Sequence, residues 1–307
     1  MSGKIVVIGS SNVDFIMKMD HLPRVGESVP NAEFMQTFGG KGANQAVAVA
    51  RAGGSVDFIG CVGDDAFGTQ VIANLKQAGV GVAFTFVEAG VASGAALVMI
   101  GAAGQNYLSV APGANHRLSR DHLDRARACI AQADLVLFQY EILPDVLAYG
   151  VELAHALGKT IMLNLAPAQP IARDVLRRVN ILVVNEVEAE FLCGFSVAPG
   201  ESAQRAARFL QTLGPEVVII TLGAAGAELA AADQQHTLPG FVVPAVDTTA
   251  AGDVFCGALA VALAEGQALP AAARFANAAA ALAVTRLGAQ PSIPTRREID
   301  SFLASFQ

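Results

Sequence analysis

Short runs of β-branched and other apolar residues alternate with amphipathic stretches through the middle and second half of the chain, and this alternation constrains the fold most. The runs are 56–61, 135–138, 160–164, 181–184 and 217–221. Apolar runs of this length are typical of parallel strands buried on both faces. The stretches between them end like helices, with Asp65 before 66–77 and Gly158 after 144–157. With a first buried strand near the N-terminus, they predict an α/β fold with a doubly wound, mainly parallel sheet flanked by helices.

Two segments, about 14–38 and 90–110, break this alternation. Each holds two strand-like stretches without a helix between them, at 15–19, 33–37, 95–100 and 106–110. We expect them to form a small antiparallel sheet inserted into a single domain that spans residues 1–307. So few strands are not stable alone, so the sheet should pack on the main domain or on a second copy. Helices are expected to end the chain, at 252–265, 271–286 and 295–305.

Composition excludes two classes of function. The 307-residue chain is 53% hydrophobic and 15% charged, which is enough apolar surface for a folded core. Its mean hydropathy of +0.47 comes largely from alanine, and no run approaches the roughly 20 apolar residues of a membrane span. A net charge of −7 offers no basic surface to nucleic acid. The sequence therefore predicts neither a membrane protein nor a nucleic-acid-binding protein.

The N-terminus and the spacing of cysteine and histidine bear on location and on metals. The first apolar stretch is too short for a signal peptide, so we expect a cytoplasmic protein. The cysteines at 61, 129, 193 and 256 are too far apart for a zinc motif or a dense disulfide framework, and reduced thiols are expected. The five histidines show no metal-ligating spacing either.

The segment DTTAAGD, residues 247–253, directly precedes an apolar helical stretch. Small residues at a helix start let a phosphate approach the free backbone N–H groups, whose dipoles favour an anion. The usual phosphate-binding loop and the dinucleotide motif G-x-G-x-x-G are both absent. The segment therefore indicates an anion-binding turn of another kind, although its spacing also fits a simple helix cap at Asp253.

A second glycine-rich segment, FGGKGANQA at residues 38–46, precedes a predicted helix through Arg51. Its glycines permit left-handed backbone and close approach of a ligand. Asn44 offers both a hydrogen-bond donor and an acceptor, which suits a polyol. A glycine-rich hinge with a solvated Lys41 is the alternative.

These segments and four others together resemble the ribokinase-like (PfkB-type) carbohydrate kinases. The others are NEVE at 185–188, TLGAAG at 221–226, NLAPA at 164–168 and GAQPS at 288–292, and all occur in the family's order and spacing. The resemblance spans essentially the whole chain and implies a Rossmann-like fold with a β lid. It also implies ATP-dependent phosphorylation of D-ribose at the 5-hydroxyl, giving D-ribose 5-phosphate and ADP. Alternatives are a kinase for another furanose, such as deoxyribose or a nucleoside, or a non-catalytic sugar or nucleotide sensor.

The resemblance also implies roles for individual residues. Asp253 would be the general base for the sugar hydroxyl, and Ala250, Ala251 and Gly252 would complete the anion hole. The sugar would be bound by Asn12, Asp14, Gly40, Lys41, Gly42, Ala43, Asn44, Glu141 and Asp253. ATP would be bound by Asn185, Thr221, Leu222, Gly223, Ala224, Ala225, Gly226, Gly252 and Asn277. Without the family, Asn12 and Asp14 would be predicted as a turn, and Glu141 as a strand end at the sheet edge where ligands bind.

Two ions and a second subunit are implied as well. Glu188 would hold Mg²⁺ through water beside the ATP phosphates, because hard oxygen ligands suit this ion; Asn185 and Glu188 also fit a helix-capping pair, and both roles can hold together. An activating K⁺ would lie beside the anion hole, at Asp247, Thr249, Ala283, Arg286, Gly288 and Ser292. The alternative for Asp247 is a turn hydrogen bond to Thr249. The implied partners are D-ribose, ATP and a second copy, bound through the lid as a homodimer.

Overall fold

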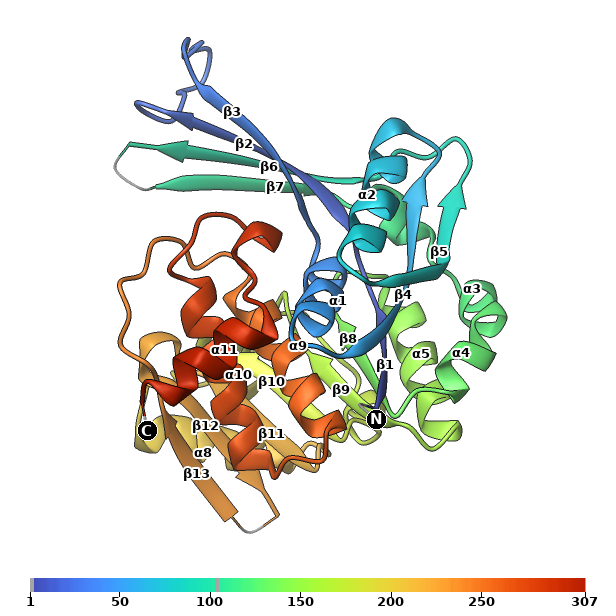
Figure 1. Ribbon diagram of the computed structural model, residues 1–307, viewed down its shortest axis with the longest axis vertical. Coiled ribbons are helices and arrows are strands. Elements are labelled where there is room, and N and C mark those ends of the chain that lie inside the picture. Colours follow the sequence, from blue (N-terminus) through green and yellow to red (C-terminus); the bar gives the residue numbers. More distant parts are fainter. Residues whose placement is uncertain (1–2, 103–104, 233, 307) are drawn as a thin grey trace.

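The computed structural model describes residues 3–102, 105–232 and 234–306, which form a large sheet with helices on both faces and a smaller sheet beyond one edge (Figure 1). The strands of the large sheet are β1 (Lys4–Ile8), β4 (Ser55–Gly63), β5 (Gly81–Glu88), β8 (Leu135–Gln139), β9 (Thr160–Asn164), β10 (Ile181–Asn185), β11 (Val217–Thr221), β12 (Gly226–Ala231) and β13 (Gln234–Pro239). Their order is β13-β12-β11-β10-β9-β8-β1-β4-β5. All neighbours from β11 to β5 pair in parallel, and β12 and β13 add antiparallel strands at one edge.

Helices cover both faces of this sheet, which confirms the predicted doubly wound architecture. One face packs against α1 (Lys41–Arg51), α2 (Ala66–Gln77), α9 (Ala251–Ala264), α10 (Leu269–Ala283) and α11 (Arg296–Ala304). The other packs against α3 (Arg120–Arg125), α4 (Arg127–Ala131), α5 (Pro144–Ala156), α6 (Arg173–Leu176), α7 (Glu186–Cys193) and α8 (Glu201–Gln211). Short 3₁₀ turns lie at Gly113–Arg117, Gly223–Ala225 and Gln290–Ser292. None of the helices in the described part of the chain has both the length and the apolar character of a membrane span.

The apolar runs become strands because both of their faces are covered. Every residue of β8 is buried, and Phe58 and Phe138 are among the largest side chains with no exposed surface, one in the core of each face. The periodicity does not predict β5, β12 or β13. These strands lie at or next to the two sheet edges, and the edge strand β13 is half exposed and largely polar.

The smaller sheet is the predicted lid, and we call it the lid sheet. It consists of β2 (Asn12–Met19), β3 (Glu33–Gly39), β6 (Gly94–Gly101) and β7 (Asn106–Ala111), in the order β3-β2-β6-β7. The hairpins β2/β3 and β6/β7 are antiparallel as expected. The pair β2/β6 is parallel, because both insertions leave the main domain at the same place, with Asn12 opposite Gly94. One lid face looks onto the 245–249 and 287–289 loops across a cleft of about 470 Å³.

Helices α1 and α9 lie unusually close, and this contact brings the two glycine-rich segments together. A Cβ added to Gly257 would lie 2.5 Å from the Cβ of Ala48 and 2.9 Å from the carbonyl oxygen of Gln45. Real Cβ atoms do not approach other atoms this closely, so the contact requires glycine. The packing sets Gln45 of α1 beside Asp253 of α9.

We predict that Gly257→Ala lowers the free energy of unfolding by about 1–3 kcal/mol, the usual cost of overpacking a core. Gly257→Val should cost more, because the larger side chain forces the helices further apart. Urea unfolding of the two variants and the parent measures the series. Equal stability of all three proteins would show that the helices do not depend on this contact.

Candidate active site

The residues expected to bind ligands converge where the parallel strands of the main sheet end. Ser10 follows β1, Glu141 follows β8, and Asn164, Asn185 and Thr221 are the last residues of β9, β10 and β11. The carboxyl edge of a parallel sheet is where open α/β folds bind ligands. The amino-terminal ends of α1 and α9 open onto the same edge, so both glycine-rich segments face it.

Asp253 lies in the first turn of α9 and is 5% exposed. Its Oδ2 accepts a hydrogen bond from Asn44 Nδ2 at 2.9 Å, and its Oδ1 accepts one from Gln45 Nε2 at 3.0 Å. Burial raises the pKa of Asp253, while Lys41 and the two amides oppose the rise without cancelling it. The helix-cap interpretation is wrong, because the N-cap position is Ala250 and no side chain caps this helix.

The turn before α9 leaves room for an anion. Ala250 has a left-handed backbone, with φ of 61°, which is strained for a residue with a side chain. A Cβ added to Gly252 would meet no atom within 4 Å, so the fold does not need glycine there. The N–H groups of the first helical turn have no partner inside the helix. They border a cavity of about 190 Å³ whose lining includes Lys41, Asn185, Glu188 and residues 250–253.

Lys41 supplies positive charge to this cavity, so it is not a solvated hinge residue. Burial lowers the pKa of Lys41, but the charges of Asp253, Glu141, Glu188 and Cys256 together raise it by more, and the net shift is upward. The ammonium group therefore stays charged among carboxylates, and its position suits a phosphate as well as a sugar.

The sugar-side residues form a second polar group, next to Asp253. Asn12 and Asp14 lie in β2, so the interpretation as a turn is wrong. Burial, followed by the charges of Glu141 and Asp253, raises the pKa of Asp14 to about 6. Asp14 Oδ1 and Asn44 Oδ1 are buried and have no hydrogen-bond partner among the described residues. Two buried acceptors without donors fit a ligand that carries hydroxyl groups.

Several of the predicted sugar-binding residues make hydrogen bonds or close contacts that fix the loop after β1. Glu141 Oε2 accepts hydrogen bonds from Ser10 Oγ at 2.6 Å and from the Lys41 N–H at 3.0 Å. Ala43 donates its N–H to the Ser10 carbonyl at 2.8 Å. Gly40 has φ of 84°, and a Cβ there would lie 2.6 Å from Ser11 Cα. Gly42 is equally tight against Ser10. Gly40, Gly42 and Ala43 therefore fix the loop after β1 against α1.

A cavity of about 310 Å³ adjoins the anion turn and suits a nucleotide. Its lining is mainly apolar and includes Phe241, Phe255 and Val284, together with Thr221, Gly223, Ala224, Gly226 and Gly252. Asn277 also lines it, and its buried Nδ2 finds no acceptor in the described structure. Leu222 and Ala225 do not line the cavity; Leu222 packs into the core on the opposite face.

The segments expected to hold ions are well ordered by their own hydrogen bonds. Asn185 and Glu188 form the expected capping box, in which Glu188 Oε2 accepts from the Asn185 N–H at 2.9 Å. Asp247 accepts from Thr249 N at 2.9 Å, which confirms the turn hydrogen bond, and from Gly288 N at 2.9 Å. The remaining residues of the expected potassium site, Ala283, Arg286 and Ser292, lie in the segment around Gly288; the Arg286 side chain pairs with Glu298.

The site also uses residues that sequence reasoning missed. Gln45 is fully buried; besides Asp253, its Nε2 contacts Asn164 Oδ1 at 3.1 Å, and its Oε1 accepts from Gln139 Nε2 at 2.7 Å. Asn115 donates to Asn12 Oδ1 at 2.8 Å and so orients it. Gln45 sits inside the glycine-rich segment, which is a usable signal, whereas no pattern marks Gln139 or Asn115.

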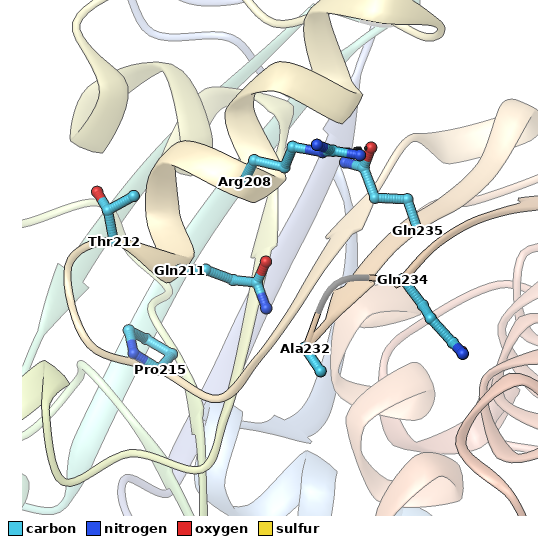
Figure 2. Close-up of a pocket in the computed structure, with 7 residues that line it drawn as sticks. All are labelled: Arg208, Gln211, Thr212, Pro215, Ala232, Gln234 and Gln235. Atoms are coloured by element: carbon cyan, nitrogen blue, oxygen red, sulfur yellow. Dashed lines mark hydrogen bonds between the residues drawn. The ribbon is translucent and has the colours of Figure 1, made fainter.

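Another cavity, of about 500 Å³, lies far from this chemistry, beside α8 and the β12–β13 hairpin (Figure 2). Among the described residues that line it, Arg208 is charged, and it donates to Gln235 Oε1 at 2.7 Å. The other described lining residues include glutamines and Thr212, and none of them is a nucleophile with an adjacent base. This cavity is therefore a weaker candidate for the functional site than the one at the carboxyl edge of the main sheet.

Comparisons with known proteins agree with this geometry. The pfkB family carbohydrate kinase profile matches residues 2–296. A ribokinase from Haemophilus influenzae is 38% identical over 303 residues, which cover 99% of both chains. A ribokinase from Bacillus subtilis is 39% identical over 300 residues, 98% of this chain and 99% of that one. A deoxyribokinase from Salmonella typhi is 34% identical over 301 residues, 98% of each. An Arabidopsis thaliana ribokinase structure complexed with ribose and ATP has a TM-score of 0.92 at 31% identity, covering 99% of each chain.

We predict that Gln45→Met lowers turnover by roughly 10- to 100-fold, as expected when a group that orients a reactive residue is lost. The Gln45 amide lowers the pKa of Asp253. Removing it raises that pKa further, so the acid limb of the pH dependence of kcat/KM should move to higher pH. Gln132→Met, at an exposed residue, is the control. An unshifted acid limb in a folded Gln45→Met protein would exclude this positioning role.

Proposed function

This chain belongs to the pfkB family of carbohydrate kinases, and we propose that it transfers the γ-phosphoryl group of ATP to the 5-hydroxyl of D-ribose. The products are D-ribose 5-phosphate and ADP. The observation that carries this assignment is the position of Asp253, buried between unpartnered sugar-side acceptors and a helix start that can bind an anion. The full-length similarity to ribokinases supports ribose as the acceptor.

The reaction needs one proton acceptor. The 5-oxygen of ribose attacks the γ-phosphorus, the bond from phosphorus to the oxygen that bridges to the β-phosphate breaks, and ADP leaves with that electron pair. Asp253 accepts the hydroxyl proton, which becomes acidic only as the new bond forms. The amides of Asn44 and Gln45 hold the carboxylate in place while it does so.

Hydrogen-bond donors and a positive charge are already in position to stabilise the negative charge on the transferred phosphoryl group. The N–H groups of the turn at 250–253 and the Lys41 ammonium surround the cavity where the phosphate would lie. Fixed donors of this kind stabilise a transition state without reorganising. Loss of the positive charge or of the turn geometry should therefore affect turnover more than sugar binding.

Mg²⁺ fits the phosphate cavity through Glu188. Both carboxylate oxygens of Glu188 already accept hydrogen bonds from Asn185, at 2.9 and 3.2 Å. They retain lone pairs for ordered water, so they suit an ion held through its water shell. When bound with ATP, the ion offsets phosphate charge; the capping box keeps Glu188 in place.

K⁺ fits beside the anion turn, where the segments around Asp247 and Gly288 meet. The Asp247 carboxylate bridges Thr249 and Gly288, and its pKa is lowered, because these hydrogen bonds and the charge of Lys18 together outweigh the opposing effect of burial. The charge of Asp247 and the carbonyl oxygens that the resemblance implies, those of Thr249, Ala283, Arg286 and Gly288, suit a hard monovalent ion. Such an ion would order the turn that binds the phosphate.

The lid sheet supports a homodimer. It exposes large apolar side chains on both faces: Phe34, Met35, Leu97, Tyr107, Leu108 and Val110 are each at least 39% exposed. Large exposed apolar side chains that gather on one element are typical of interaction sites. A second copy is the occupant whose lid carries the same surface. The free cysteines of the described chain support a cytoplasmic location, as expected for a metabolic kinase.

We predict that the purified protein phosphorylates D-ribose in preference to 2-deoxyribose and to nucleosides. A coupled ADP-release assay over this panel tests the assignment. Asp253→Asn should keep the fold and much of the ribose binding but lose roughly 10²- to 10⁴-fold in turnover. Preference for another furanose would change the substrate, and no turnover on any of them would indicate a sensor. Near-normal turnover of folded Asp253→Asn would exclude Asp253 as the base.

We predict that K⁺ raises activity several-fold over Na⁺ or tetramethylammonium at matched ionic strength. Asp247→Ala should remove the difference, because the carboxylate that compensates the ion's charge is gone. Steady-state rates in the three chloride salts measure this. Equal rates for the parent protein would reject the potassium site and leave the kinase assignment intact.

We predict a homodimer at micromolar concentration, measured by light scattering. Replacing exposed Leu108 with a charged residue, Leu108→Glu, should shift the mass toward the monomer, because a charge is costly in an apolar contact. Ribose should also slow hydrogen exchange across the strands within 14–38. A monomeric parent protein without such protection would refute a lid-mediated dimer.

A further inference from the structure

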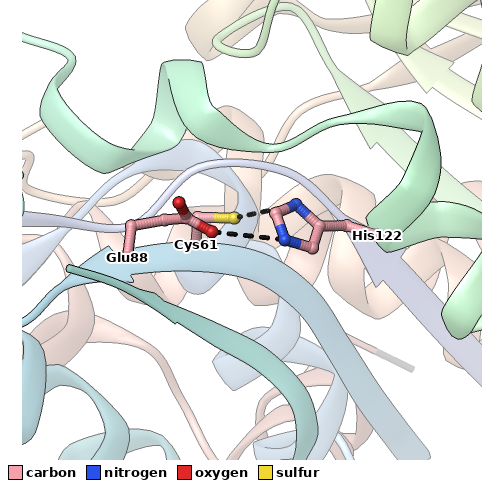
Figure 3. Close-up of side chains that lie close together, drawn as sticks. All are labelled: Cys61, Glu88 and His122. Carbon is pink, nitrogen blue, oxygen red and sulfur yellow. Dashed lines mark hydrogen bonds and ion pairs between the residues drawn. The ribbon is translucent and has the colours of Figure 1, made fainter.

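Three possible metal ligands converge on the face of the main sheet opposite α9. Cys61 lies in β4, Glu88 ends β5 and His122 lies in α3. One ligand atom from each lies within 4.8 Å of the others, and Figure 3 shows the three side chains pointing toward one another. The residues are far apart in the sequence, so linear spacing, which predicts no zinc site, could not reveal them.

The distance between Glu88 and His122 is close to that of two ligands on a single ion. Glu88 Oε1 lies 3.2 Å from His122 Nε2, and Cys61 Sγ lies 3.7 Å from His122 Nδ1. Around tetrahedral zinc, with metal–ligand distances of about 2.0–2.3 Å, neighbouring ligand atoms are roughly 3.3–3.6 Å apart. The carboxylate and Nε2 have about this separation. The Cys61 sulfur is 3.7 Å from the other ring nitrogen, so its side chain must move toward Nε2 to reach the same ion.

Ser119 determines how the imidazole ring can act. Its Oγ lies 3.2 Å from His122 Nδ1, and the Phe86 ring stacks on the imidazole with centroids 4.3 Å apart. When Nδ1–H donates to Ser119, the lone pair of Nε2 faces the Glu88 carboxylate. These two electron-rich atoms repel each other unless a proton or a cation lies between them. Metal-binding histidines commonly donate their other ring N–H to an oxygen in this way.

We propose that Cys61, Glu88 and His122 bind one divalent cation of the zinc type. Sulfur, imidazole nitrogen and carboxylate oxygen form a ligand set that zinc accepts, whereas Mg²⁺ and K⁺ prefer oxygen alone. The Glu88 and His122 side chains are 27% and 12% exposed, which leaves a path for the ion and for a water as fourth ligand.

Metal binding is coupled to the loss of a proton from the thiol. The facing groups are His122 from α3, Glu88 from β5 and Ser119 at the start of α3. The cation replaces the thiol proton and takes the lone pair of Nε2, so affinity falls as pH falls.

The site lies at the foot of the lid sheet. Gly63 of β4 pairs with Glu88 and donates its N–H to Ser93 Oγ at 3.0 Å, and Ser93 directly precedes β6. A bound ion would tie β4, β5 and α3 together beside this connection. It should therefore stabilise the folded protein against heat.

Titration of the reduced, chelator-treated chain with Co²⁺, without nucleotide, tests the proposal. We expect one Co²⁺ per chain, with a thiolate-to-cobalt charge-transfer band and the intense visible bands of a tetrahedral ion, both removed by competing Zn²⁺. Cys61→Ser and His122→Ala should abolish the charge-transfer band or weaken binding at least tenfold. Cys193→Ser, at a partly buried thiol in α7, is the matched control and should bind like the parent.

No charge-transfer band in the parent, or an equal band in Cys61→Ser, would overturn the proposal. If Cys61→Ser does not fold, Glu88→Gln provides the decision, because it keeps the shape and removes the charge. Its affinity for Co²⁺ should fall at least tenfold, and an unchanged affinity would overturn the proposal. Zn²⁺ should also raise the Tm of the parent but not that of Glu88→Gln. None of these measurements depends on kinase activity.

Discussion

The structure depends on keeping a buried carboxylate, Asp253, at the start of a helix and surrounded by other acids. Burial disfavours its charged form, and Asp14 and Glu141 carry the same charge nearby. Lys41 and the amides of Asn44 and Gln45 offset this cost. Those compensating groups all belong to α1. The close packing of α1 on α9 is therefore part of the chemistry of the site, since a wider gap would leave the carboxylate without its donors.

The need to keep these carboxylates buried also explains why the lid sheet is part of the site. Asp14 comes from a lid strand, while Asp253 comes from the main domain, and the pKa of each is raised first by burial. Access of water would weaken the pKa shifts of Asp14 and Asp253 and the hydrogen bonds around both carboxylates. A sheet that closes over the carboxyl edge excludes water and contributes a sugar-side carboxylate at once. Strand β2 follows β1 after only three residues, so sugar contacts pass directly into the main sheet.

Features with a local cause could be predicted from the sequence, and features made by distant contacts could not. The central strands follow from apolar runs covered on both faces, and the anion turn from small residues before a helix. The parallel pairing of β2 with β6 depends on where two insertions leave the domain, which no local pattern encodes. Gln139 resembles any strand residue until the fold places it against Gln45. Cys61, Glu88 and His122 likewise meet only because β4, β5 and α3 pack together.

The empty space around Gly252 has a consequence for how such proteins diverge. Most glycines near the site leave no room for a Cβ atom, as is the case for Gly40 and Gly42, so replacing them would damage the fold. A Cβ atom at Gly252 would meet no neighbouring atom, so alanine or serine could replace this glycine with little loss of stability. Selection on folding alone would not remove such a change. A side chain at this position would enter the space that the turn leaves for an anion, so such a change would alter the cavity before it altered the fold.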